Sequence, residues 1–323
     1  ASRFTVASAK RPTLALNATW AEVGGTLVGT ITASPKVSTE LLVVELRDRR
    51  SRIIGRLTPV PVLAPNGTLI SHAFSTAVPA WWPMLVHVRA VILTPDGGGA
   101  EIGDSVQYFK VVKRFRGTFN FLSWDIPVGP TGIYAHEALH NLGVRVQLIG
   151  SSSVPRTVSA FEMSVVSYTT RIMADLDASG NLRPCPWNLE PDIDTAVDAI
   201  VNPYTQARRH GVYAYSLGDE VAVRGSDYSA SDLAAYRQFL SAEYSGYISA
   251  LNSNWGSAYA SFGDVTLSNL TDRDELTSMK AGIWPRWFDR QSWASENFNL
   301  LCARFGRSFR RIDPKAIVGF EGA

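Results

Sequence analysis

The stretch from Gly211 to Glu220 reads GVYAYSLGDE, and it decides how the rest of the chain is interpreted. It opens with apolar and aromatic residues and ends with two adjacent carboxylates, Asp219 and Glu220. A run of this composition after a helical segment is typical of a buried parallel strand. Carboxylates at the C-terminal tip of such a strand lie where barrel enzymes hold their reacting groups. We therefore predict a strand over 212–217 that leads to Glu220.

Around this stretch, strands alternate with helices, and the pattern predicts parallel βαβ units over residues 114–323. The other segments typical of strands are 118–124, 144–149, 157–166 and 316–320. The expected helices are 133–142, 194–208 and 291–311, with one more that starts at Ser229 and keeps its buried stripe as far as Leu251. Five strands are fewer than the eight that close a parallel barrel. The sequence thus predicts strands 1–5 of a (β/α)8 TIM-type barrel, completed by a further polypeptide segment or a second chain. An open, doubly wound sheet is the alternative.

Residues 1–113 show no helical periodicity and predict a separate domain. Short alternating runs at 26–32, 41–47 and 85–93 are separated by turn residues such as Gly24-Gly25. Several short strands at regular spacing favour an immunoglobulin-like β-sandwich. The expected fold is therefore a multidomain β and α/β protein, with the sandwich as a packing domain or a sugar-binding module.

Composition narrows the classes of partner. The chain has 323 residues, is 46% hydrophobic and carries a net charge of +2. This charge gives no electrostatic case for nucleic acid, and no apolar run reaches the ~20 residues that span a membrane. Cys185 and Cys302 lack the spacing of metal ligands, so no metal site or cofactor is expected, and a disulfide or two thiols stay open. The start at Ala1 leaves a processed N-terminus open; the localisation is unknown, with a secreted or periplasmic one slightly favoured.

The stretch 215–220 and the later segment 251–259, LNSNWGSAY, together resemble a known family. They are similar to the family 42 glycoside hydrolases, β-galactosidase-like enzymes of the large retaining (β/α)8 clan. The resemblance covers about residues 117–323 and is most specific over 213–262. It implies hydrolysis of β-linked sugars with retention, and a Glu at the end of strand 4 as general acid/base, which here is Glu220.

The chain departs from the family at two positions. The clan usually has Asn before the acid/base, where its amide bonds the sugar 2-OH, but Asp219 can only accept hydrogen bonds when ionised. The family nucleophile lies on strand 7, beyond the strands expected here. Glu321, at the end of the fifth strand, fits a pocket-wall residue better and is the fallback nucleophile.

A retaining glycosidase needs two carboxylates about 5–5.5 Å apart. By strand alternation, Asp219 turns away from the face to which Glu220 points, so it is expected to touch substrate rather than to react. Side chains near other strand ends, or able to stack on sugar rings, are further candidates for substrate binding, with packing roles as the alternative. They are Trp124, Asp125, Ser151, Glu162 and Trp255.

Two other functions stay open. A non-catalytic carbohydrate-binding or scaffold protein on the same barrel is favoured by Asp219 and by the missing strands. A zinc metalloprotease is suggested by His136-Glu137-Ala138-Leu139-His140, which matches H-E-x-x-H. The extended form of that motif needs a third His where this chain has Val146. Helical phasing also predicts an apolar face made of Ala135, Ala138, Leu139 and Leu142, with both histidines beside it, toward solvent. The expected partner is a carbohydrate, and a homo-oligomer stays open.

Overall fold

The computed structural model describes residues 11–33, 41–67, 69–94, 100–124, 127, 129–150, 156–168, 193–219, 230–266, 280–282 and 284–321. The chain divides into two compact units. The first comprises Ala1–Ser167 and Gln206–Tyr213, and the second Tyr168–Thr205 and Ala214–Ala323. These units are defined by how densely residues contact one another, not by fold type. The domain boundary at residues 113–114 therefore stays a prediction.

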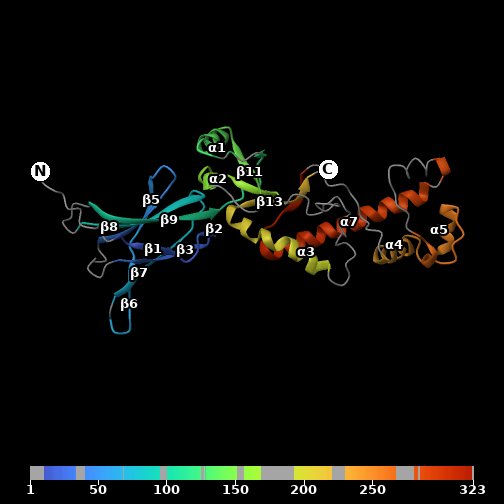
Figure 1. The fold of residues 1–323 in the computed structure, drawn as a ribbon, viewed down its shortest axis with the longest axis horizontal. Helices are drawn as coiled ribbons and strands as arrows, with labels where there is room; N and C mark the ends of the chain where they lie inside the picture. The colour runs from blue at the N-terminus through green and yellow to red at the C-terminus, as the bar shows by residue number, and fades with distance from the viewer. Residues whose placement is uncertain are drawn as a thin grey trace. The chain divides into compact units, whose positions relative to one another are not determined.

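Two mainly antiparallel sheets form the N-terminal part (Figure 1). One sheet has the order β1-β3-β7-β6 and the other β2-β9-β8-β4-β5. Their strands are β1 (Thr13–Leu16), β2 (Trp20–Glu22), β3 (Thr26–Thr32), β4 (Leu42–Arg47), β5 (Ile53–Leu57), β6 (Val60–Leu63), β7 (Leu69–Ala77), β8 (Leu85–Leu93) and β9 (Glu101–Val112). The runs at 26–32, 41–47 and 85–93 are thus confirmed as strands β3, β4 and β8.

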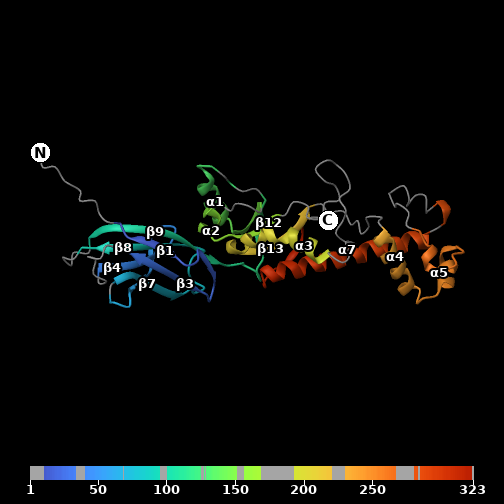
Figure 2. The ribbon, with the colours of Figure 1, turned by 60° about the horizontal axis from the view of Figure 1, so that its bottom comes forward.

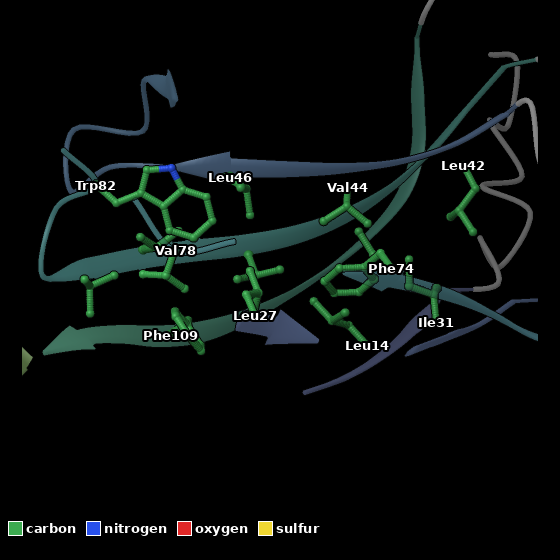
Figure 3. Close-up of a cluster of buried hydrophobic side chains, with 14 of the residues drawn as sticks. Leu14, Leu27, Ile31, Leu42, Val44, Leu46, Phe74, Val78, Trp82 and Phe109 are labelled. Carbon is green, nitrogen blue, oxygen red and sulfur yellow. The ribbon is translucent and has the colours of Figure 1, made fainter. Parts of the chain in front are cut away.

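The apolar faces of these sheets meet in one core (Figure 3). In β3, alternate residues are buried, so Leu27 and Ile31 enter the core while Thr26 and Thr32 are exposed. Gly29 lies between them because the Phe74 ring and the Ala15 carbonyl occupy the space that a Cβ would need. Burial of large side chains such as Phe74, at about 25 cal/mol per Å² of apolar surface, is the main stabilising contribution here.

A separate parallel sheet has five strands in the order β10-β11-β12-β13-β14. Its strands are β10 (Phe121–Ser123), β11 (Val144–Gly150), β12 (Ser164–Tyr168), β13 (Val212–Asp219) and β14 (Val318–Glu321). β10 pairs with β11, and β13 with β14, in parallel. Sequence order and spatial order agree across these described strands, whereas a doubly wound sheet reverses its order at a switch point. The molecule is therefore a mixed β and α/β protein.

Helices alternate with the strands of this sheet along the chain (Figure 2). They are α1 (Gly132–Asn141), α2 (Arg156–Ala160), α3 (Ile193–Val201), the 3-10 segment η3 (Asn202–His210), α4 (Ala230–Glu243), α5 (Ile248–Trp255), the 3-10 segment η4 (Phe262–Asp264) and α7 (Trp284–Ile312). Even the longest of the described helices, α7, is too polar to cross a membrane.

Two sequence expectations about these elements are wrong. The strand expected over 157–166 begins only at Ser164, because Arg156–Ala160 forms a helical turn that buries Val158. The single long helix expected from Ser229 to Leu251 is two helices. Ser245 and Gly246 have φ angles of 52° and 81°, and this left-handed backbone cannot continue an α-helix.

Candidate functional site

The carboxyl end of the β13–β14 pair carries the acidic residues. In its register Tyr215 lies opposite Val318, Ser216 opposite Gly319, and Asp219 opposite Glu321. Three steps along β13 match two along β14, so β13 has a bulge between Ser216 and Asp219. Gly218 lies within it at a φ of 144°, a conformation that other residues rarely adopt, and its N–H donates to the Ser216 hydroxyl at 3.2 Å. The glycine in GDE therefore has a backbone role.

Helix α7 covers one face of this strand pair. The Tyr215 ring lies 4.5 Å from the Phe309 ring, and its hydroxyl donates to Asp313 at 3.0 Å. Phe320 stacks on Phe298 at 5.5 Å between ring centroids. Tyr215 and Phe320 thus mark the helix-facing side of β13 and β14. Ser216, the next residue along, belongs to the opposite side.

The bulge places Asp219 on the side that Ser216 occupies. Asp219 is paired with Glu321, which follows the pair Ser216–Gly319 by an even step on β14, so the paired positions share one face. The expectation that Asp219 turns away from the face of Glu220 stays a prediction, because the bulge lies before Asp219 and fixes its face relative to Ser216. Neighbouring strands lie about 4.8 Å apart, so Asp219 and Glu321 are adjacent acidic positions at the carboxyl ends of β13 and β14. Glu220 itself lies outside the described residues.

The other residues expected to touch substrate are spread over several places. Trp124 directly follows β10 and is 49% exposed. Asp125 and Ser151 lie outside the described residues. Trp124 is therefore the described member of this group that presents an exposed aromatic surface at a strand end.

Glu162 lies at the amino end of β12, not at its carboxyl end. One carboxylate oxygen accepts the Met84 backbone N–H at 2.6 Å, and the other accepts from Lys113 Nζ at 3.2 Å. Its φ of 58° is unusual for a residue with a side chain, and these two bonds offset that strain. The contacts of Glu162 tie the start of β12 to the sandwich, which accounts for this residue structurally.

Trp255 packs in a cluster of helical side chains. It is 7% exposed, and its indole N–H donates to Asp289 Oδ2 at 2.8 Å. Tyr244 donates to the same oxygen at 2.5 Å. The cluster comprises Tyr236, Leu240, Leu251, Trp255, Val265 and Trp293. These are the contacts of a core residue, which was the alternative for Trp255.

The H-E-x-x-H segment lies on α1, and the prediction of which face of this helix is buried is wrong. His136 is fully buried, whereas Leu142, placed on the apolar face by the sequence, is 77% exposed. His136 stacks on Phe161 and bonds the Gly132 carbonyl at 2.8 Å, and His140 bonds the Phe161 carbonyl at 2.6 Å. Both histidines of the motif are therefore engaged by Phe161 and by backbone carbonyls, which gives them structural partners in place of a metal ion.

The charges around these histidines do not suit a metal cation either. The Arg49 guanidinium lies 4.1 Å from the Phe161 ring centroid and pairs with Glu137 at 3.4 Å. Arg145 lies 3.1 Å from His140 Nδ1. Among the described residues no three His, Cys, Asp or Glu side chains are grouped as metal ligands would be. The residues of this motif therefore fit a structural helix that packs on Phe161.

Gly218 is the residue of this site that sequence reasoning missed. An isolated glycine inside a strand pattern is a signal for a bulge, and SLGDE carries it. What the pattern could not give is the register with β14, which fixes the face on which Asp219 lies.

Comparison of the sequence with protein-family models and with curated proteins gives no match. Among solved structures, the chain is distantly similar to β-glucuronidases. The Bifidobacterium dentium enzyme, solved with coumarin-3-O-glucuronide, is 11% identical with a TM-score of 0.30; the match covers 74% of this chain and 42% of that one. For the β-glucuronidase of an uncultured Clostridium species the values are 10% identity, a TM-score of 0.30, and 97% and 61% coverage. The chain spans less than two thirds of the length of either.

Proposed function

We propose that this chain carries the acid/base half of a retaining glycoside hydrolase site for β-linked sugars, with Glu220 as general acid/base. One observation supports this most: acidic residues at the carboxyl ends of two adjacent parallel strands occupy paired positions, Asp219 and Glu321. Glu220 is the next residue along from that pair. Carboxyl ends of parallel strands are where enzymes of this architecture hold their reacting groups.

The spacing suits the chemistry. Adjacent strands are about 4.8 Å apart, so the paired positions of Asp219 and Glu321, next to Glu220 in the sequence, have a spacing close to the ~5–5.5 Å between carboxyl groups in retaining glycosidases. Glu220 protonates the leaving oxygen and later deprotonates the attacking water. Glu321 is the nucleophile candidate within this chain, and Asp219 accepts a hydrogen bond from a sugar hydroxyl beside them.

The architecture is consistent with this role. The described strands of the parallel sheet follow in chain order, as the first five strands of a (β/α)8 barrel do. The barrel would occupy residues 114–323 and the sandwich 1–113. Trp124, exposed after β10, offers an aromatic surface on which the apolar face of a sugar ring can stack, and Asp125 and Ser151 follow β10 and β11 in the sequence.

The test is a panel of nitrophenyl β-glycosides with the wild-type chain, three variants of the site and one control variant. Glu220→Gln should abolish turnover of the substrate that the wild type hydrolyses, because the amide cannot donate or accept the proton. Glu321→Gln should do the same if it is the nucleophile. Asp219→Asn should raise KM more than it lowers kcat. Glu243→Gln, on an exposed residue of α4, is the matched control and should leave turnover unchanged.

The stereochemistry of the first product anomer, followed by NMR, tests retention separately. Full turnover by Glu220→Gln would refute the role of Glu220. Turnover with inversion would refute the pairing with a second carboxylate about 5 Å away.

A non-catalytic carbohydrate-binding protein is the second candidate. It is favoured by Asp219, an acceptor at the position where the clan of the family 42 glycoside hydrolases, which the sequence resembles, usually has the amide donor Asn. Calorimetric binding of a glycoside that no condition hydrolyses would decide for this alternative.

A further inference from the structure

At the amino end of β13, far along the strand from its acidic end, a lysine and a histidine share a hydrogen bond. Lys110, on β9, lies with its Nζ 2.7 Å from His210 Nδ1, and His210 is 6% exposed. The other ring nitrogen, Nε2, accepts from Arg209 Nε at 3.1 Å. Both nitrogens of one imidazole are therefore in contact with groups that ordinarily donate.

This arrangement fixes the protons. An arginine Nε always carries its hydrogen and has no lone pair to offer, so His210 Nε2 must be the acceptor. A neutral imidazole with Nε2 unprotonated carries its hydrogen on Nδ1. Nδ1–H then points at Lys110 Nζ, which can accept it only as an uncharged amine. The hydrogen-bond pattern thus favours the uncharged amine form of Lys110, whose lone pair faces Nδ1–H of His210.

The surrounding charges act in the same direction. Burial, with the nearby Arg209 and Arg156, lowers the pKa of Lys110 to about 8. Burial, with Lys110 and Arg209, lowers the pKa of His210 to about 3, so His210 stays neutral. The Arg156 guanidinium stacks 4.2 Å from the Tyr108 ring centroid, on the strand that carries Lys110.

The carboxylates described near this strand are held by other cations. Glu22 accepts from Arg114 at 3.3 Å and from Arg208 at 3.0 Å. Glu162 is paired with Lys113. The charged groups that act on Lys110 from the described residues of η3 and α2 are Arg209 and Arg156, both cationic. An uncharged amine at Lys110 therefore has a lone pair available for reaction and lies in an environment of positive charge.

We propose that Lys110 is a covalent modification site for carbon dioxide, which its amine takes up as a carbamate. The Nζ lone pair forms an N–C bond to the carbon of CO2, and one C=O electron pair moves onto oxygen. One N–H proton leaves to water. The product is a carbamate anion and a proton, and nothing is oxidised or reduced.

Charge selects CO2 among the electrophiles that react with amines. An aldehyde would give an imine, which is neutral or cationic, and an acyl donor would give a neutral amide. Of these three products, only the carbamate is an anion. It would accept from His210 Nδ1–H and lie in the field of Arg209 and Arg156, whose charge makes an anion favourable and a cation unfavourable.

The experiment traps the adduct on the full chain. The protein is equilibrated at pH 8 with ¹³C-bicarbonate, alkylated with triethyloxonium to fix carbamates as ethyl esters, and mapped by peptide mass spectrometry. At this pH about half of Lys110 is amine, whereas an ordinary lysine, of pKa about 10.4, is about 0.4% amine. Lys110 should therefore carry at least about tenfold more label than Lys113, three residues along and held by Glu162. Equal labelling, or none on Lys110, overturns the proposal.

Variants test the proton assignment. Lys110→Arg should remove the label from this position. Arg209→Gln removes the obligatory donor to Nε2, allows the other tautomer and lets Lys110 keep its proton, so the label should fall several-fold. Arg208→Gln, whose partner is Glu22, is the matched control and should leave the label unchanged. Full labelling of Arg209→Gln would refute the hydrogen-bond argument and the proposal with it.

Discussion

The two ends of β13 differ in charge and in the structural role of the glycine at each end. The amino end begins after His210 and Gly211, beside Lys110 and arginines, and each group there has a defined partner. The carboxyl end has Gly218 and Asp219, with Glu321 as register partner. Both glycines have positive φ, 71° at Gly211 and 144° at Gly218. One end of the strand is therefore packed against backbone and the other carries acidic residues, which is the separation of stability from chemistry that the proposed function requires.

The largest effect is expected at the amino end, from Gly211→Ala. A Cβ at Gly211 would overlap the Lys113 carbonyl oxygen, and the positive φ adds strain. We expect unfolding to become easier by more than about 3 kcal/mol, because the obstacle is backbone and cannot move aside. Gly143→Ala, with a φ of 89° but nothing within 4 Å of its Cβ, is the control and should cost about 1 kcal/mol. Urea titration measures both, and equal losses would contradict the packing role of this end.

The next effect concerns the bulge at the carboxyl end. Gly218→Ala should push β13 toward a regular pleat and turn Asp219 and its neighbours to other faces. A displacement of about 1 Å at reacting groups lowers kcat/KM by about 100-fold, whereas stability should change little by comparison. Gly319→Ala, opposite Ser216 on β14 with open space at its Cβ, is the matched control and should stay active. Equal activity of the two variants would remove the bulge from the proposed mechanism.

A smaller effect should appear in the pH dependence of stability. The folded-state pKa of His210 is about 3 because of burial and of Lys110 and Arg209, while an unfolded histidine has a pKa of about 6.5. As pH falls below 6.5 the unfolded chain binds a proton that the folded chain does not, so unfolding becomes easier, by at most about 1.4 kcal/mol per pH unit. Between pH 6.5 and 5 most carboxylates do not titrate. His210→Gln should therefore show a flatter stability curve than wild type in urea titrations across this window, and parallel curves would contradict the assignment.

The regular parts of the fold could be predicted from local pattern. β3 alternates clearly, and β13 is a continuous apolar run, so both were found from composition and period alone. The helix break at Ser245 and Gly246 and the helical turn at Arg156–Ala160 were missed. The first depends on two backbone angles, and the second is too short for periodicity to distinguish it from a strand.

The site was only partly predictable, because its decisive features are not local. The acids of GDE were found from the sequence, but the face of Asp219 depends on pairing with β14, about a hundred residues later. His136 was placed toward solvent by helical phasing, and it is buried because Phe161, from another segment, stacks on it. The tautomer of His210 likewise needs Lys110 and Arg209 together, which no spacing rule connects.

The smallest effect should come from Tyr215→Phe, on the helix-facing side of β13. This substitution keeps the ring against Phe309 and removes only the hydroxyl that donates to the buried carboxylate of Asp313. Hydrogen bonds to charged groups contribute about 1.5–3 kcal/mol, but the Asp313 carboxylate also accepts the backbone N–H of Lys315, so the lower end is expected. Because Asp219 lies on the other face, the turnover that the proposed function predicts should not change. A Tyr215→Phe variant that stays stable but loses turnover would show that the two faces of β13 are coupled, and the separation of packing from chemistry along and across this strand would not hold.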